Sequence, residues 1–577
     1  MFVARDFPRR ANSTRNSGSP VSVTSRSPAR GDFTVVAALL LAVATALWLF
    51  AWWEPVPTGA DAPGYYVPAR MQATGSSTIL VPTSPVQYVG GHWLDAGDGR
   101  FVSRYPPGVP FLASLLYRAG GAEVAPALNL LLAALLVFLV VVWARRLVAL
   151  WAALAAGTIF ASLAAFAEQS LLGFSHLPTA TALLAAVLFA DRWHDGARRS
   201  DAFLAGLFAG LLPALRYPEA LLTLVIGLWA LLHVRSARHA RTLPVMIAGA
   251  LVPVALVLAY NTRLFGSPLA TGYALTGEAG GFGAGYLARH AVPYLTTLAR
   301  NLGPSMLAGG VGMLLLWRRE GTTGRGSLLA ALVASMTVAY MAFFWPFADV
   351  RFLLPTLPLW VVAGVWLATQ TSTQRRARLL VAALLGAHAV IFAADSLPRT
   401  RRIARFADRM RLTSDAVRRT VPPGSVVIAP GPFQSLMEYR GDWKLAEWTL
   451  LWTGPLPPRP TGVPSARTND GKLQPSPDQR GKGATLRRKY EGLDEGARVR
   501  AALDDAFAWA GGAPVVWIGD DRWTSSAGAL VAPGYRLERL ASIEAGGDST
   551  PPAAWWLPSL PVGVFRVVPA NGAPGAR

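Results

Sequence analysis

The sequence contains no cysteine, which excludes a disulfide scaffold, a thiolate metal site and a cysteine nucleophile. Charge is also scarce, because Asp, Glu, Lys and Arg make up 15% of the 577 residues, against about 25% in a soluble protein. The formal net charge of +21 therefore does not indicate a nucleic-acid-binding protein. The chain has no P-loop, no Gly-x-Ser-x-Gly motif, no dinucleotide fingerprint and no His/Asp/Glu cluster with metal-ligand spacing.

Long apolar runs are what the sequence has instead. Hydrophobic residues make up 52% of the chain, and Trp, which favours membrane interfaces, occurs 20 times. A helix needs about 20 apolar residues to cross a bilayer. Runs of this kind lie at 33–53, 126–144, 148–165, 174–191, 201–214, 219–233, 243–260, 299–317, 327–345, 351–370 and 379–395. The sequence predicts a polytopic α-helical membrane protein with about 11 transmembrane helices.

The distribution of arginine predicts which side each loop faces. Segments assigned to the inside hold 20 Lys and Arg, whereas the outside segments up to residue 351 hold nine, as the positive-inside rule requires. Residues 1–32 are then a basic cytoplasmic tail, and residues 108–117 form an interfacial helix because they are too short to cross. We predict a multi-pass protein of the cell (plasma) membrane with a cytoplasmic N-terminus.

The chain beyond about residue 396 changes character. An odd number of spans places this part outside the cell. Short apolar runs typical of strands occur at 425–429, 514–518 and 563–568, and a helix-like stretch occupies 491–509. We therefore predict an extracytoplasmic α/β domain over 396–577, with a mobile insertion at 454–484 that is rich in Pro, Gly, Arg and Ser.

The first outside loop, residues 54–125, is the longest in the membrane half (33–395), and long ordered loops are usually functional. Asp61 follows Trp53 by only eight residues, so we expect it near the outer headgroup level. Pro63 and the pair Tyr65-Tyr66 come directly after it, and Asp95 and Asp98 follow later in a Gly-rich stretch.

These features resemble the GT-C glycosyltransferases. An Asp after the first span, a Pro, a Tyr pair and a Tyr-Pro-Pro-Gly-x-Pro segment at 105–110 are similar to the family 39-type branch, which includes protein O-mannosyltransferases and the aminoarabinose transferase of lipid A. The further matching segments are 206–210 leading to Arg216-Tyr217, 260–261, 265–268, 271–273 and 346–355.

The resemblance implies a GT-C-like catalytic domain over 33–395. It also implies inverting transfer of a sugar from a polyprenyl-phosphate donor, with Asp61 as the general base. Several family members have an Asp-Glu pair where this chain has Asp61-Ala62, so the second carboxylate is lost or has moved to Asp95 or Asp98.

The departing phosphate needs positive charge, which the planar guanidinium of arginine supplies well. The candidates for donor and phosphate binding are Arg70, Arg104, Arg216, Arg351 and His176. Tyr65, Asp95 and Asp98 are candidates for contact with the acceptor or for loop structure. We expect a membrane lipid and an extracytoplasmic glycan, lipid or protein acceptor as partners, and no nucleic acid. No cofactor is certain, and a divalent metal ion is left open.

Each candidate also has a structural alternative. Asp61 can cap the helix that follows it, Asp95 and Asp98 suit a turn, and His176 suits the start of a span after the capping residue Ser175. Arg216 can pair with Glu219, and Arg351 with Asp349. The spacing of Gly206 and Gly210 indicates close helix packing.

Two other functions compete with glycosyl transfer. The first is a secondary transporter or lipid-sugar flippase, which places charged and broken-helix features at mid-membrane. Three of the expected spans (33–53, 126–144 and 243–260) lack charged residues well inside, which disfavours this class. The second is a non-catalytic GT-C-like scaffold.

Overall fold

A computed structural model describes residues 33–59, 61–234, 236–276, 280–344, 350–429, 431–451, 488–520, 534–543 and 562–569. The predicted cytoplasmic tail 1–32, the predicted insertion 454–484 and Asp349 lie outside the described residues.

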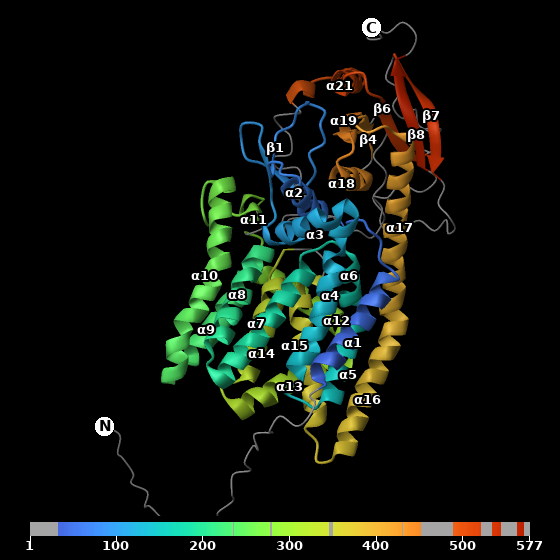
Figure 1. Cartoon of the computed structure of the whole chain (residues 1–577). Helices are drawn as coiled ribbons and strands as arrows, with labels where there is room; N and C mark the ends of the chain where they lie inside the picture. Colours follow the sequence, from blue (N-terminus) through green and yellow to red (C-terminus); the bar gives the residue numbers. More distant parts are fainter. Residues whose placement is uncertain are drawn as a thin grey trace, which may run out of the picture.

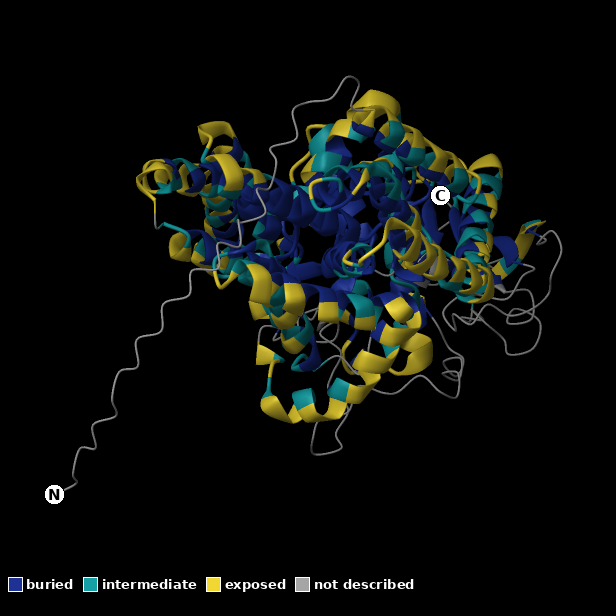
Figure 2. Cartoon of the chain, turned by 90° about the horizontal axis from the view of Figure 1, so that it is seen from below, coloured by how far each residue is buried: buried dark blue, intermediate teal, exposed yellow. Residues whose placement is uncertain are grey.

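The body of the molecule is a bundle of helices that run roughly side by side (Figure 1). Its helices are α1 (Thr34–Phe50), α4 (Leu128–Ala144), α5 (Leu150–Ala161), α6 (Ala164–Leu171), α7 (His176–Gly196), α8 (Arg199–Leu215), α9 (Ala220–Leu232), α10 (Ala237–Phe265), α12 (Ala284–Leu302), α13 (Pro304–Glu320), α14 (Arg325–Met341), α15 (Leu357–Thr369) and α16 (Gln374–Ile391). Figure 2 shows buried residues in the middle of the bundle and exposed faces around its rim. Many of the rim residues are large and apolar, which is typical of a surface that faces lipid.

Each expected apolar run coincides with a helix or with parts of two helices. By length and composition, four helices of the described residues can cross a bilayer: Gly108–Ala144, Ala237–Phe265, Val350–Thr369 and Gln374–Thr420. The pair α5 and α6, bent by 63°, would be a fifth. Other apolar helices, such as α1 and α14, have only 17 residues. The structure is thus mostly helical with several apolar helices, and the number of eleven spans stays a prediction.

Two helices lie largely outside the expected membrane spans. The first, α2 (Pro63–Ala73), lies within the first outside loop. The second is α12, which lacks a continuous apolar run but buries His290, Tyr294 and Leu298 at intervals of four residues. This spacing is the signature of a helix with one buried face.

Helices α8 and α10 approach each other closely at two glycines. A Cβ on Gly206 would lie 1.8 Å from the backbone oxygen of Met246, and one on Gly210 would lie 2.3 Å from that of Ala250. Any side chain at these positions would force the helices apart, so the prediction of close packing from the glycine spacing is confirmed.

A five-stranded sheet lies beyond one end of the bundle, which we call the sheet end (Figure 1). Its strands are β4 (Val426–Ile428), β5 (Lys444–Ala446), β6 (Val515–Asp520), β7 (Tyr535–Ile543) and β8 (Val562–Pro569), in the order β5-β4-β6-β8-β7. Strands β5, β4 and β6 are parallel, and β8 is antiparallel to both β6 and β7. The three apolar runs predicted as strands are β4, β6 and β8. Helices α18 (Gly431–Arg440), α19 (Trp448–Leu451) and α21 (Glu495–Ala510) belong to the same part of the chain.

The first outside loop lies between the bundle and this sheet (Figure 1). It contains α2, a small sheet of β1 (Ile79–Leu80), β2 (Trp93–Asp95) and β3 (Phe101–Ser103), and α3 (Gly108–Val124). Helix α3 is kinked at Gly120 and Gly121, whose dihedral angles are not helical. The backbone N–H of Tyr88 donates to Leu445 on β5 (2.7 Å), and the N–H of Glu447 donates to Val86 (2.7 Å). The large sheet is therefore bonded directly to the loop that carries Asp61.

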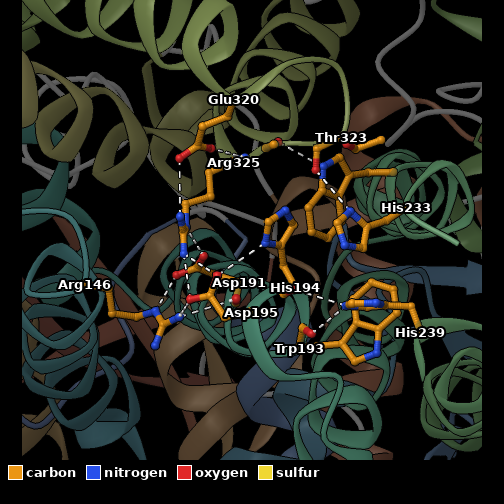
Figure 3. A network of polar contacts seen from close by, with 12 residues as sticks. Arg146, Asp191, Trp193, His194, Asp195, His233, His239, Glu320, Thr323 and Arg325 are labelled. Carbon is orange, nitrogen blue, oxygen red and sulfur yellow. Dashed lines mark hydrogen bonds and ion pairs between the residues drawn. The ribbon is translucent and has the colours of Figure 1, made fainter. Parts of the chain in front are cut away.

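The opposite end of the bundle carries an arginine–aspartate network (Figure 3). Arg146 contacts Asp191 (2.5 Å) and Asp195 (2.6 Å), and Arg325 contacts the same two carboxylates. Arg325 also pairs with Glu320 at 3.3 Å. Because Arg146 follows α4, the two aspartates lie on α7 and Arg325 begins α14, the network ties together segments distant in sequence.

Candidate functional site

Asp61 lies in the turn that precedes α2 at the sheet end. Helix α2 has no side-chain cap, so the capping alternative for Asp61 does not apply. Its Oδ1 instead accepts a hydrogen bond from the hydroxyl of Tyr105 (2.8 Å). Among the described residues no hydrogen-bond donor reaches Oδ2, and the side chain is 29% exposed. One carboxylate oxygen is thus held in place while the other remains able to accept a proton.

Arg104 and Tyr105 hold this carboxylate from the chain that follows β3. Nη2 of Arg104 lies 3.6 Å from Oδ1 of Asp61 and donates to the Tyr105 hydroxyl (2.6 Å). The Tyr105 ring packs directly on the backbone of Gly64, where a Cβ would lie 2.2 Å from the ring. A glycine at this position of α2 is what allows the ring to reach Asp61.

Tyr65 connects Asp61 with a second group of polar residues. Its ring centroid is 4.5 Å from that of Tyr105, and its hydroxyl is 2.8 Å from Oγ of Ser175. Burial, and to a smaller extent the charge of Asp61, raise the pKa of Tyr65, while Arg216 and Arg104 act in the opposite direction. Tyr65 therefore stays a neutral hydroxyl between the carboxylate and Arg216.

Arg216 is the centre of the second group, which is deeply buried. Its Nε lies 2.7 Å from Glu219, Nη1 lies 2.7 Å from Nε2 of His176, and Nη2 donates to the hydroxyl of Tyr340 (3.0 Å). The Tyr340 hydroxyl in turn donates to Glu219, which is fully buried. The pairing of Arg216 with Glu219, proposed as the structural alternative, is therefore present.

His176 and Arg351 complete this group. His176 begins α7, and the side chain of Ser175 does not cap the helix but contacts Tyr65. Arg351 lies at the start of η4 (Val350–Thr356), a short 3-10 helix that leads into α15. Its guanidinium lies over the rings of Phe174 (5.2 Å) and Phe352 (5.0 Å). Arg216 lies 5.6 Å from the same Phe352 ring. The two arginines thus flank one aromatic side chain.

The other three candidates lie elsewhere. Arg70, at the far end of α2, donates to the backbone oxygen of Glu438 on α18 (3.4 Å). Asp95 accepts from the N–H of Gly97 (2.8 Å), and Asp98 is 89% exposed with a positive φ of 54°. Asp95 and Asp98 therefore form the turn between β2 and β3, as their structural alternative predicted. The structure does not bring Asp98 or Arg70 into contact with Asp61.

Glu438 is a buried carboxylate that the sequence analysis did not identify. Trp93 donates to its Oε1 (2.7 Å), and Nε2 of His92 lies 3.6 Å from its Oε2. Burial raises the pKa of Glu438 to about 7, although the bond from Trp93 and the charge of Arg70 oppose this. A single charged residue in the tail gives no sequence signal of such a contact, because its partners lie some 345 residues earlier.

The sheet end thus combines a proton acceptor with buried cationic groups. Asp61 offers a partly exposed carboxylate, while Arg104, Arg216 and Arg351 bring guanidinium groups to the same end of the molecule. No group of three or more His, Asp or Glu within the described residues has the geometry of a metal site. The arrangement can accept a proton and can stabilise a phosphate.

No model of a known protein family and no curated protein matches the sequence. Solved structures do match the fold. ArnT from Cupriavidus metallidurans bound to undecaprenyl phosphate superposes with a TM-score of 0.54 at 14% identity, covering 93% of this chain and 98% of that one. Its apo state gives 0.53 at 13% identity, covering 92% and 98%. An Archaeoglobus fulgidus oligosaccharyltransferase scores 0.45 at 12% identity, covering 85% of this chain and 70% of that one. The chain shares the fold of the two ArnT structures, so the expected resemblance is confirmed at the level of the fold alone.

Proposed function

We propose that this protein is a membrane glycosyltransferase that moves a sugar from a polyprenyl-phosphate donor to an extracytoplasmic acceptor. The observation that carries the proposal is the Asp61 carboxylate, held on one oxygen by Tyr105 and Arg104 and adjoining the buried arginines of the sheet end. The likeness to ArnT bound to undecaprenyl phosphate supports the same class of donor for this chain.

In the proposed reaction an acceptor hydroxyl attacks the anomeric carbon of the sugar. The new C–O bond forms as the bond from that carbon to the phosphate oxygen breaks, so the configuration inverts. Asp61 takes the hydroxyl proton through Oδ2, and the bonding electrons leave with polyprenyl phosphate. General base catalysis of this kind contributes about 10² to 10⁴ in rate.

The leaving phosphate requires positive charge rather than a proton donor. We assign this role to Arg104, Arg216 and Arg351, with His176 beside Arg216. The ion pair with Glu219 uses Nε of Arg216, so phosphate binding would draw on its Nη groups in place of, or beside, their contacts with His176 and Tyr340. Arg70 is left out because its guanidinium packs against α18.

The proposal also fixes an orientation. The N-terminus lies in the cytoplasm, about eleven helices cross the plasma membrane, and the sheet end faces outward as an extracytoplasmic domain. The acceptor is then a glycan, lipid or protein of the cell envelope, which reaches Asp61 from the side of the first outside loop.

The test compares Asp61→Asn with Asp98→Asn. Both remove one negative charge from the same loop, but Asp98 is exposed, lies in a turn and pairs with the exposed Arg100 at 3.7 Å. Each purified variant is incubated with a panel of radiolabelled polyprenyl-phosphate sugars and membrane extract, with and without chelator. We expect Asp61→Asn to lose about 10² or more of the transfer rate and Asp98→Asn to keep it. Full activity of Asp61→Asn would overturn the assignment of the base.

A further inference from the structure

Helix α16 presents one face that is exposed and entirely apolar. In the continuous helix Gln374–Thr420, only 17% of the most apolar stretch of 18 residues is buried inside the protein. The exposed residues between positions 379 and 394 are Leu379, Leu380, Ala382, Ala383, Gly386, Ala389, Val390, Ala393 and Ala394. A face of this composition is stable in hydrocarbon and not in water.

The length of this face approaches the thickness of a bilayer. A helix rises 1.5 Å per residue, so the apolar stretch from Leu379 to Ala394 extends for about 24 Å. The hydrocarbon core of a bilayer is about 30 Å thick. Helix α17 (Leu397–Thr420) continues the same rod toward the large sheet (Figure 1), so its first turns leave the membrane at the sheet end.

Exposed arginines stand at both limits of the apolar face. Arg375, Arg376 and Arg378 precede it, and Arg401, Arg402 and Arg405 follow it. The Arg401 guanidinium lies 5.7 Å from the ring of Trp52, directly after α1. Because tryptophan prefers the membrane interface, Trp52 independently places the second group of arginines at headgroup level.

Nearby arginines on α17 have acidic partners. Arg399 pairs with Asp395 and Glu168, and Arg411 pairs with Glu54 and Asp408. Within the described part of the chain, Arg402 makes no ion pair. The charge of Arg402 is therefore exposed and is not neutralised by an acidic side chain of the described residues.

We propose that Arg401, Arg402 and Arg405 form a binding site for the phosphate of an anionic phospholipid headgroup in the leaflet at the sheet end. The occupant is a lipid because the apolar face of α16 leads directly into the site and would contact the acyl chains. This lipid is distinct from the donor, and the site does not depend on the sugar-transfer reaction.

The test uses the full-length protein, delipidated in detergent. Phosphatidylglycerol and phosphatidylcholine with the same acyl chains are added in equal amounts, and native mass spectrometry measures the lipid that stays bound. The variant Arg401→Gln/Arg402→Gln/Arg405→Gln is compared with Arg419→Gln/Arg536→Gln/Arg566→Gln, which removes the same charge from exposed arginines away from the apolar face. The variant Arg401→Lys/Arg402→Lys/Arg405→Lys keeps the charge.

In the first variant we expect the preference for phosphatidylglycerol over phosphatidylcholine to fall at least about fivefold. The reason is that each basic residue near an anionic surface strengthens binding by about a factor of five. The distal and lysine variants should keep the preference. The proposal fails if the first variant binds as the wild type does, if the distal variant loses equally, or if excess glycerol phosphate displaces the lipid, which would indicate a site for free phosphate.

Discussion

The two ends of the helical bundle use the same chemical groups in different proportions. In the arginine–aspartate network, Asp191 and Asp195 each contact both Arg146 and Arg325, and Asp191 is 2% exposed. At the sheet end, Asp61 has one hydroxyl donor and one arginine at 3.6 Å, and it is 29% exposed.

Under the proposed function, this difference distinguishes a structural carboxylate from a reactive one. A carboxylate surrounded by two guanidinium groups is fixed in place. Protonation of this carboxylate would break the ion pairs that hold three helical segments together. A carboxylate held on one oxygen keeps its direction while its other oxygen can react. We therefore expect mutations to affect stability at one end and turnover at the other.

The largest effect on stability is expected for Asp191→Ala. This change leaves Arg146 and Arg325 without their most buried partner, and breaking a buried ion pair on one side costs about 3 kcal/mol or more. Thermal unfolding in detergent should show a clearly lower Tm, while the protein that remains folded should transfer sugar at the wild-type rate.

Asp408→Ala is the matched control, because Asp408 forms an exposed pair with Arg411 that contributes at most about 1 kcal/mol. An equal loss of Tm in both variants would contradict a special role for the network.

An intermediate effect, on turnover alone, is expected for Gly64→Ala. The new Cβ would lie 2.2 Å from the Tyr105 ring and 2.8 Å from Cβ of His92, so the ring must move away from Asp61. Displacement of a positioning group by about 1 Å can lower a rate by as much as 10². The measurement is the initial rate of transfer at equal amounts of folded protein.

Gly227→Ala controls for the added methyl group, because that Cβ would meet no atom within 4 Å. Wild-type turnover in Gly64→Ala would show that Tyr105 does not need its present position.

The smallest effect concerns pH and the contact between the large sheet and the first outside loop. Glu438, which faces Arg70, His92 and Trp93, has its pKa raised from 4.5 to about 7 by burial. The folded protein therefore holds a proton that the unfolded chain releases between these values, so stability falls as pH rises. Between pH 5 and pH 8 we expect Tm to drop by a few degrees more in the wild type than in Glu438→Gln.

Glu123→Gln is the control for this pH series, since Glu123 is 62% exposed. A wild-type Tm that changes with pH no more than the Tm of Glu438→Gln would show that this carboxyl does not titrate with the raised pKa.

The sequence predicts the helical part of the fold well, because apolar runs of membrane length leave little choice of structure. The sequence also singles out Asp61, Arg104 and Tyr65 because they lie within one loop of recognisable motifs, and the structure brings them together around Tyr105. The turn at Asp95 and Asp98 follows from Gly and Asp content alone. The role of Asp61 as the base stays a prediction.

The sequence does not predict which residues far apart in the chain contact each other. The charge of Arg146 is balanced by two aspartates of α7 that lie more than 40 positions later in the chain. Glu438 meets Trp93 across 345 positions, and no local pattern encodes that contact. Helix α12 was missed because its buried face is a stripe rather than a run. In each case the partner is chosen by packing between segments, which periodicity along one segment does not report.

The most direct test of the account measures sugar transfer by Asp61→Asn and Asp191→Asn side by side, at equal amounts of folded protein. Both changes replace one carboxylate by an amide of the same shape, one at each end of the bundle. The account predicts that Asp61→Asn is folded and inactive and that Asp191→Asn is less stable but active. Transfer by Asp61→Asn at the rate of Asp191→Asn would contradict it.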